Sequence, residues 1–296
     1  MAENSVQQSP VLGVIGAGKV GCTVSRLLAK ADYVVAAVYS PTRDHAYDLA
    51  QQIGAKAVAL PDEVVNRAEL ILLTVPDDTI GSVVNDLAVK KLNIRGKAFI
   101  HTSGTHDREV LSRLAGQGAL TGSLHPAFPF ASVETAMERL AGAVFAVESV
   151  DDRLDSWLTQ AVQALGGQVL RIPPGSKVLY HAALVIASNY VVTLYAAAQR
   201  LLTNMGAERA VSERLLNTLL AGTVENLYTQ GIPDALTGPL VRGDVGTVKS
   251  HIRVLQDEDS LLPGVYQILA RLSYPILEER HIVTDLFEEV LGKGSG

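Results

Sequence analysis

Residues 11–21 constrain the fold more than any other part of the chain. They read VLGVIGAGKVG, an apolar run that breaks into three spaced glycines and continues as a helical pattern. A strand followed by a Gly-x-Gly-x-x-Gly turn and a helix is the setting in which this motif binds a dinucleotide diphosphate, because the free N–H groups of the helix N-terminus face the anion. We expect the binding turn to comprise Gly16, Ala17, Gly18, Lys19, Val20 and Gly21. The alternative is a plain glycine-rich turn.

The second expected strand, residues 33–39, predicts which dinucleotide binds. A site for NAD places an Asp or Glu about 20 residues beyond the glycine motif to bind the ribose hydroxyls. No acid follows this strand, and the chain continues with Ser40, Pro41, Thr42 and Arg43. Two hydroxyls and a guanidinium suit a 2′-phosphate, so we expect NADP, as NADPH, to be the cofactor. Alternatively, Thr42 caps the next helix and Arg43 is solvated in its first turn.

The order of apolar runs predicts the fold class. Strand-like segments at 69–76, 97–102, 119–124, 143–147 and 168–172 alternate with helical patterns, which is typical of a parallel sheet covered on both faces. Beyond Pro173-Pro174-Gly175 helical segments dominate, at 177–205, 208–228, 245–255, 261–279 and 285–291. We expect an α/β fold, in which a Rossmann doubly wound parallel sheet (1–172) is followed by an all-helical substrate and dimerisation domain (173–296).

The composition of the chain limits the kinds of partner and the cellular location that we expect. Acidic residues outnumber basic ones, 31 to 25, and no basic stripe is present, so we expect no nucleic-acid partner. The single cysteine, Cys22, allows no internal disulfide, and residues 1–10 lack a signal-peptide pattern, so we expect a cytoplasmic protein.

The most apolar stretch is residues 182–198. Polar residues interrupt it, and it is shorter than the roughly 20 residues that a membrane span needs, so we expect a buried helix and no membrane partner. Because it is apolar all round, we also expect a homodimer, although burial within one chain is an alternative.

Ligands of open α/β sheets lie beyond the carboxyl ends of the strands. After the fourth, fifth and sixth strands come Val75-Pro76, Ser103 and His125. We expect Val75, Pro76 and Ser103 to contact the cofactor and His125 to contact the substrate. Asp77 follows Pro76, and we expect it to cap the next helix, since Asp is a preferred N-cap residue.

The start of the helical region carries the expected chemistry. Lys177 and His181 are one helical turn apart and share a face, Ser188 lies near the same line, and Asn189 is offset by about a third of a turn. Reduction of a carbonyl needs a proton donor, and a lysine whose pKa is lowered by burial meets that need. We expect Lys177 and His181 to be catalytic, and Ser188 and Asn189 to bind substrate. Alternatively, Lys177 is an exposed cation and Asn189 bonds between helices.

The loop at 236–244 adds one more substrate-binding candidate. Arg242 offers a clamp for the carboxylate of a small anionic substrate, or is an ordinary loop cation, and Asp244 is well placed to cap the next helix. The seven histidines are scattered, without HExxH or CxxC motifs, so we expect no metal site.

Six segments together carry a family resemblance: VIGAGKVG, LLTVPDD, HTSG, GSLHPAFPF, KVLYHAALVIASN and LTGPLVRGD. Over nearly its whole length the chain resembles Rossmann-like bacterial oxidoreductases with a helical C-terminal domain of unknown function. Within the 6-phosphogluconate dehydrogenase-like group it is similar to the unconventional ketopantoate reductases. Ordinary ketopantoate reductases begin this helix with Lys and, four residues later, Asn; here Lys177 matches and His181 replaces the Asn.

The resemblance and the motifs together imply an NADPH-dependent reductase of a small 2-oxo acid. Ketopantoate, reduced to pantoate in pantothenate biosynthesis, is the expected substrate. Two alternatives stay open. One is an imine reductase of the pyrroline-5-carboxylate reductase type, and the other is a protein that binds NADP(H) without turnover.

Overall fold

The computed structural model describes residues 9–292, which form two compact units divided after Tyr190. We predicted a boundary after residue 172. In the structure the first turns of helix beyond Pro173-Pro174-Gly175 belong to the sheet unit, because they pack against the ends of its strands, as described below.

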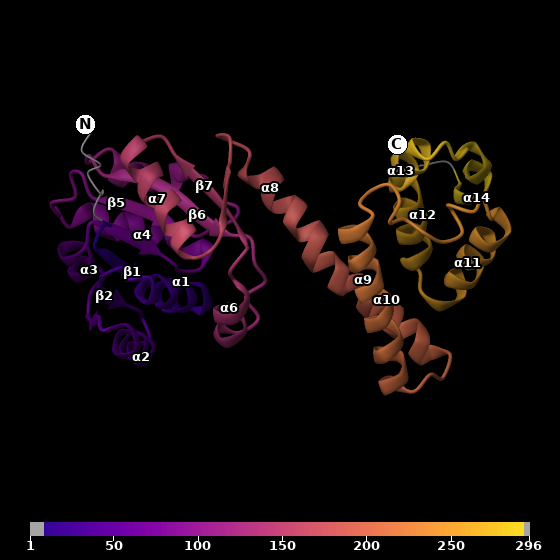
Figure 1. Ribbon diagram of the computed structural model, residues 1–296, viewed down its shortest axis with the longest axis horizontal. Helices are drawn as coiled ribbons and strands as arrows, with labels where there is room; N and C mark the ends of the chain where they lie inside the picture. The colour runs from indigo at the N-terminus through magenta and orange to yellow at the C-terminus, as the bar shows by residue number, and fades with distance from the viewer. Residues whose placement is uncertain (1–8, 293–296) are drawn as a thin grey trace. The chain divides into compact units, whose positions relative to one another are not determined.

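The first unit is built on one eight-stranded sheet with the order β3-β2-β1-β4-β5-β6-β7-β8 (Figure 1). The strands are β1 Leu12–Ile15, β2 Val35–Tyr39, β3 Lys56–Ala57, β4 Leu70–Leu73, β5 Ala98–His101, β6 Leu120–Pro126, β7 Val144–Ser149 and β8 Gln168–Arg171. This order confirms the doubly wound α/β sheet. The sheet is mostly parallel, with one antiparallel pair, β6 and β7.

Helices cover both faces of this sheet. They are α1 Lys19–Lys30, α2 Arg43–Ile53, α3 Pro61–Arg67, α4 Asp77–Val89, α5 Ser112–Ala115, α6 Val133–Arg139 and α7 Asp152–Ala164, with a short 3-10 turn, η1, at Arg108–Leu111. Neighbouring strand residues enter different cores: Val14 and Leu72 join the core that includes α1 and α7, whereas Ile15 and Ile71 join the core that includes α4. Both faces of the sheet are therefore covered by apolar cores, so we expect a ligand site at the ends of the strands.

The predicted helix at 177–205 is continuous but not regular. It comprises α8 Lys177–Leu184, a π-helical turn, η2, at Val185–Asn189, and α9 Tyr190–Asn204. A π turn holds more residues than an α turn. The placement of Ser188 and Asn189 by ideal α-helical spacing is therefore wrong, and both side chains are exposed.

This helix is also not buried as predicted. The apolar window within Lys177–Asn204 is 0% buried, with Ile186 and Val192 among the exposed side chains. By length and composition it is the one described helix that is apolar enough to cross a membrane, which is weak support for such a location on its own.

The described part of the second unit, residues 191–292, contains helices and no strand. Besides α9 these are α10 Arg209–Thr229, α11 Val245–Glu258, α12 Leu262–Leu272, α13 Tyr274–Glu279 and α14 Glu288–Leu291, with a 3-10 turn, η3, at Asp285–Phe287. A small core gathers Val248, Ile252, Ala270, Phe287 and Leu291. Asp244 caps α11 as predicted, since its Oδ1 accepts a hydrogen bond of 3.0 Å from the N–H of Thr247.

Candidate functional site

The glycine turn is held against the end of β4. Gly16 has a φ of 111°, and a Cβ there would lie 2.5 Å from the carbonyl oxygen of Thr74. A Cβ on Gly21 would lie 2.3 Å from the carbonyl oxygen of Gly16. The hydroxyl of Thr74 donates a 2.5 Å hydrogen bond to that same oxygen. Two of the three glycines thus serve close packing, and Thr74, which the sequence did not single out, fixes the turn.

The third glycine leaves an open cradle. Gly18 is exposed, has nothing within 4 Å of an added Cβ, and occupies the N-cap position of α1 without a side-chain cap. The first N–H groups of a helix have no partner within the helix, and here no capping side chain takes them. An open, uncapped helix N-terminus beside the exposed Lys19 fits a diphosphate.

The end of β2 carries the residues predicted for the 2′-phosphate. Ser40 directly follows the strand and is buried, whereas Thr42 and Arg43 are exposed at the start of α2. Thr42 holds the N-cap position, but its side chain makes no capping hydrogen bond, contrary to the capping alternative. Because β2 pairs with β1, this edge lies next to the strand that leads into the glycine turn.

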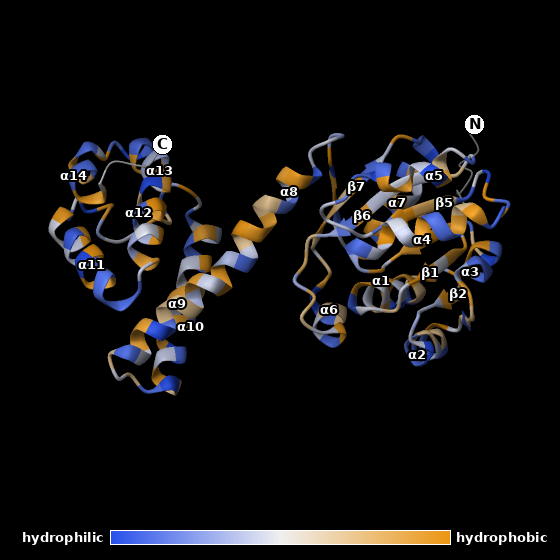
Figure 2. Ribbon diagram, turned by 180° about the vertical axis from the view of Figure 1, so that it is seen from behind, coloured by the Kyte–Doolittle hydropathy of each residue, from blue (hydrophilic) through white to orange (hydrophobic). Residues whose placement is uncertain are grey.

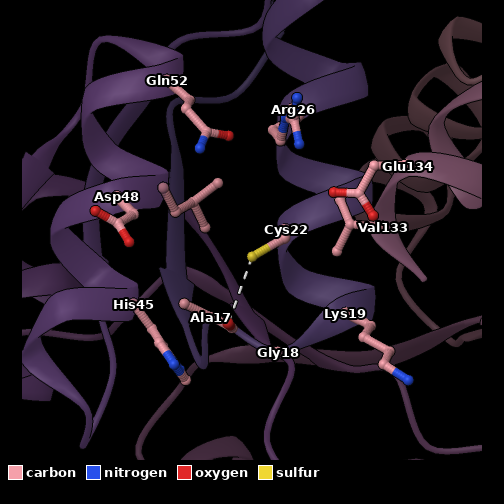
Figure 3. Close-up of a pocket in the computed structure, with 11 residues that line it drawn as sticks. Ala17, Gly18, Lys19, Cys22, Arg26, His45, Asp48, Gln52, Val133 and Glu134 are labelled. Atoms are coloured by element: carbon pink, nitrogen blue, oxygen red, sulfur yellow. Dashed lines mark hydrogen bonds between the residues drawn. The ribbon is translucent and has the colours of Figure 1, made fainter.

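A pocket of about 360 Å³ lies between α1 and α2 and reaches the glycine turn (Figure 3). In Figure 3, Cys22 and Arg26 come from one helix and His45, Asp48 and Gln52 from the other. The thiol of Cys22 donates a 3.4 Å hydrogen bond to the carbonyl oxygen of Ala17, and burial raises its pKa. The pocket therefore belongs to the diphosphate end of the site and does not include Lys177.

Lys177 lies at the other end of the site and is completely buried, which excludes the exposed-cation alternative. Its Nζ donates a 2.7 Å hydrogen bond to the carbonyl oxygen of Ser103. The hydroxyl of Ser103 donates to Oδ2 of Asp77 over 2.8 Å. The predicted capping role of Asp77 is wrong: Pro76 holds the N-cap position, and the Asp77 side chain turns to Ser103 instead.

Burial of an ammonium group is costly unless charges compensate it. Burial lowers the pKa of Lys177 to about 8, while Glu148, Asp107 and Asp77 act in the opposite direction. Glu148 belongs to a polar row that crosses three neighbouring strands, pairing with Ser123, which pairs with His101. Three carboxylates thus favour the charged form of Lys177 and oppose the effect of burial.

Three more side chains gather around Gly104. Nδ1 of His125 and the hydroxyl of Tyr180 are 2.8 Å apart, with their rings edge to face. A Cβ on Gly104 would lie 2.9 Å from Nε2 of His125 and 2.8 Å from Cδ2 of His181, so only glycine fits between the two imidazoles. Burial, then Lys177, lowers the pKa of His125 to about 4, and burial raises the pKa of Tyr180 to about 12.

The structure therefore brings several predicted residues together: Ser103, His125, Lys177 and His181. Val75 and Pro76 directly follow β4 and precede α4. Ser188 and Asn189 lie in the π turn, and Arg242 lies in the second unit, where it is exposed. Their roles stay predictions. Among residues 9–292 no group of three or more His, Cys, Asp or Glu side chains is arranged to hold a metal ion.

Tyr180 is the functional candidate that the sequence analysis missed. The signal was present, because Tyr180 lies between Lys177 and His181 in the segment KVLYH. Only the three-dimensional structure shows that its hydroxyl meets His125, 55 positions away in the chain.

Comparisons with known proteins agree with this architecture. Residues 2–126 match a Rossmann-like domain family, and residues 143–272 match a domain of unknown function, DUF2520. No curated protein matches the sequence. The second match begins at β7, so it includes the last two strands of the sheet as well as helices of the second unit.

Solved structures share the fold. Protein TM1727 from Thermotoga maritima is 28% identical, with a TM-score of 0.73 over 92% of this chain and 100% of that one. A pyrroline carboxylate reductase from Plasmodium falciparum with NADP bound is 15% identical, with a TM-score of 0.58 over 94% and 98%. A reductive aminase from Aspergillus terreus in complex with NADPH is 15% identical, with a TM-score of 0.62 over 96% and 92%. The chain thus combines a Rossmann-like N-terminal domain with a C-terminal region similar to DUF2520.

Proposed function

We propose that this protein is an NADPH-dependent oxidoreductase that reduces the carbonyl of a small 2-oxo acid, with ketopantoate as the substrate to test first. The observation that carries the proposal is the uncapped N-terminus of α1 beneath the open space at Gly18. Solved structures of the same fold hold NADP or NADPH, which supports the choice of cofactor. When bound, reduced nicotinamide supplies the hydride.

Different residues of the chain would bind different parts of the cofactor. The glycine turn from Gly16 to Gly21 would hold the diphosphate. Ser40, Thr42 and Arg43 would hold the 2′-phosphate, since no acid stands at the end of β2 to select the free ribose. Val75, Pro76 and Ser103, at the ends of β4 and β5, would border the nicotinamide.

Lys177 and His181 would be catalytic residues of the reduction. The buried Lys177 ammonium supplies positive charge close to the developing alkoxide, where a low-dielectric environment strengthens its effect. His181 is half-buried beside Gly104 and is therefore placed to meet substrate. We assign substrate binding to His125, Ser188, Asn189 and Arg242, with Arg242 as the carboxylate clamp.

We further propose a cytoplasmic homodimer that binds no nucleic acid and no membrane. The net charge of −6 disfavours nucleic acid. Figure 2 shows apolar residues along α9 and α10. Several of their side chains are exposed, as a subunit interface requires: Val192, Leu215, Leu219, Val224 and Leu227.

A second candidate is reduction of a C=N bond in a cyclic imine. The observation that favours it is the engagement of Lys177, whose Nζ is buried and donates to the carbonyl oxygen of Ser103, so that its ammonium is not free to protonate a substrate carbonyl. A protonated imine already carries its proton and needs no such donor.

The test is oxidation of NADPH, followed by its absorbance, with ketopantoate, other 2-oxo acids and pyrroline-5-carboxylate. We expect turnover with ketopantoate above all others. Turnover only with pyrroline-5-carboxylate would show that the substrate is a cyclic imine and not a 2-oxo acid. Saturable NADPH binding without oxidation by any compound would contradict the enzymatic function and leave a nucleotide-binding protein.

A further inference from the structure

The side chain that contacts the substrate need not be the most deeply buried polar side chain of the site. Lys177 is fully buried, and its Nζ already donates to the carbonyl oxygen of Ser103. Tyr180, His125 and His181 are half-buried. Within the first unit the phenol and the imidazoles are therefore more accessible to a bound substrate than Lys177 is.

We propose that Tyr180, hydrogen-bonded to His125, is the catalytic proton donor of this site. The proposal rests on the proposed reductase function and deepens it. A phenol is a suitable general acid when its oxygen can be reprotonated at once. The 2.8 Å contact between the Tyr180 hydroxyl and Nδ1 of His125 provides that connection.

The proton transfer balances in the following order. The O–H bond of Tyr180 breaks as a new O–H or N–H bond forms on the substrate, whose carbon accepts hydride from the reduced cofactor. The Tyr180 oxygen takes the proton from Nδ1 of His125, and Nε2 of His125 takes one from water. One hydride and one solvent proton are consumed, and His125 remains neutral in its other tautomer.

The surrounding charges favour this route. Lys177 and His181 both lower the pKa of His125, Asp77 acts in the opposite direction, and burial has the largest effect. His125 is therefore neutral at physiological pH, as a relay between its two nitrogens requires. Lys177 then contributes its positive charge and its hydrogen bond to the carbonyl oxygen of Ser103, and transfers no proton itself.

The experiment uses the full chain and the variants Tyr180→Phe, His125→Asn and both together. We expect each single variant to lower turnover about 100-fold or more, with NADPH binding unchanged. The double variant should be no slower than the slower single one, because either change already breaks the relay. Tyr228→Phe, which removes the hydroxyl of a tyrosine that is 85% exposed, is the matched control and should keep the wild-type rate.

A second readout does not depend on activity. In protein labelled with ¹⁵N-histidine, Tyr180→Phe should shift the Nδ1 resonance of His125, because it removes the partner of that nitrogen. An unchanged resonance, or turnover of Tyr180→Phe within about threefold of wild type, would overturn the relay and leave the reductase function standing. A wild-type protein that binds NADPH and reduces none of the compounds offered would overturn both.

Discussion

Individual side chains at this site have roles that their residue type alone does not indicate. Lys177 is a buried cation whose free energy depends on Glu148, Asp107 and Asp77. The chain thereby keeps a positive charge in its interior next to the predicted substrate position. A buried cation lowers the free energy of unfolding, and the size of this effect can be measured.

Replacement of Lys177 by Met tests the cost directly. The pKa is about 8 in the folded chain and 10.5 in the absence of burial. Between these values the unfolded state binds more protons, so the folded protein gains stability as the pH rises and loses it as the pH falls toward 8. The difference in unfolding free energy between wild type and Lys177→Met should therefore shift by about 3 kcal/mol in favour of wild type over this range.

Urea denaturation at several pH values measures this difference. Lys249→Met, which removes an exposed lysine, controls for the loss of one positive charge. A wild-type and a Lys177→Met curve that stay parallel from pH 8 to pH 10.5 would show that the ammonium is not buried in solution.

Two glycines of the turn allow binding and packing to be separated. Gly18→Ala meets no atom within 4 Å and should fold normally, yet its methyl group occupies the diphosphate cradle, so we expect NADPH affinity to fall at least about tenfold. Gly21→Ala drives a methyl group to 2.3 Å from the Gly16 carbonyl oxygen and should lower the melting temperature as well. Calorimetry and a thermal scan compare them; equal melting temperatures for both variants would be inconsistent with this packing.

The residues that the sequence revealed and those that it hid differ in a physical respect. The three glycines act through local backbone geometry, which a motif records. Thr74, Asp77 and Tyr180 act through partners 58, 26 and 55 positions away. Such contacts depend on how strands and helices are brought together, and no local pattern reports them.

Secondary structure elements show the same division. Apolar runs and turn residues were enough to place every described strand except the two-residue β3, and the helices of the C-terminal region, because burial imposes its period on the sequence. The antiparallel direction of β7 was not predictable from its apolar residues, since hydrophobicity records burial and not direction. The π turn at Val185–Asn189 adds a residue to a turn without any change in composition, so ideal spacing misplaced Ser188 and Asn189.

One helix cap offers a test at this scale. Asp244 binds both the N–H and the hydroxyl of Thr247 at the start of α11. Asp244→Ala should lower the free energy of unfolding of the second unit, because the N–H and hydroxyl of Thr247 lose their acceptor; chemical denaturation measures this. Asp234→Ala removes an exposed acid nearby and should leave stability unchanged. Equal stability of the two variants would argue against the cap.

The whole molecule combines a well-packed sheet unit with a helical unit whose core is small. Among the described residues, α10 exposes Leu219, Val224 and Leu227, which are 62%, 43% and 47% accessible. Exposed apolar surface of this kind favours association with a second copy. The boundary at residue 190 did not follow from the sequence, and the buried helix that the sequence suggested was the stretch 182–198, not α10.

Sedimentation tests the proposed dimer. We expect a dimer for wild type and a monomer for Leu219→Glu, because a buried unpaired carboxylate disfavours the interface. Val89→Glu places the same charge at a position on α4 that is 71% exposed, and should remain dimeric. A wild-type protein that is monomeric at micromolar concentration would contradict the proposal.

The proposed function depends above all on the binding of NADPH by the turn at Gly16–Gly21 together with the end of β2. Titration of wild type and Arg43→Ala with NADPH and with NADH measures this binding. We predict saturable binding of NADPH by wild type, a loss of about 10- to 100-fold in NADPH affinity for Arg43→Ala from the missing phosphate contact, and unchanged affinity for NADH. Absence of saturable binding of either reduced coenzyme to wild type would contradict the account.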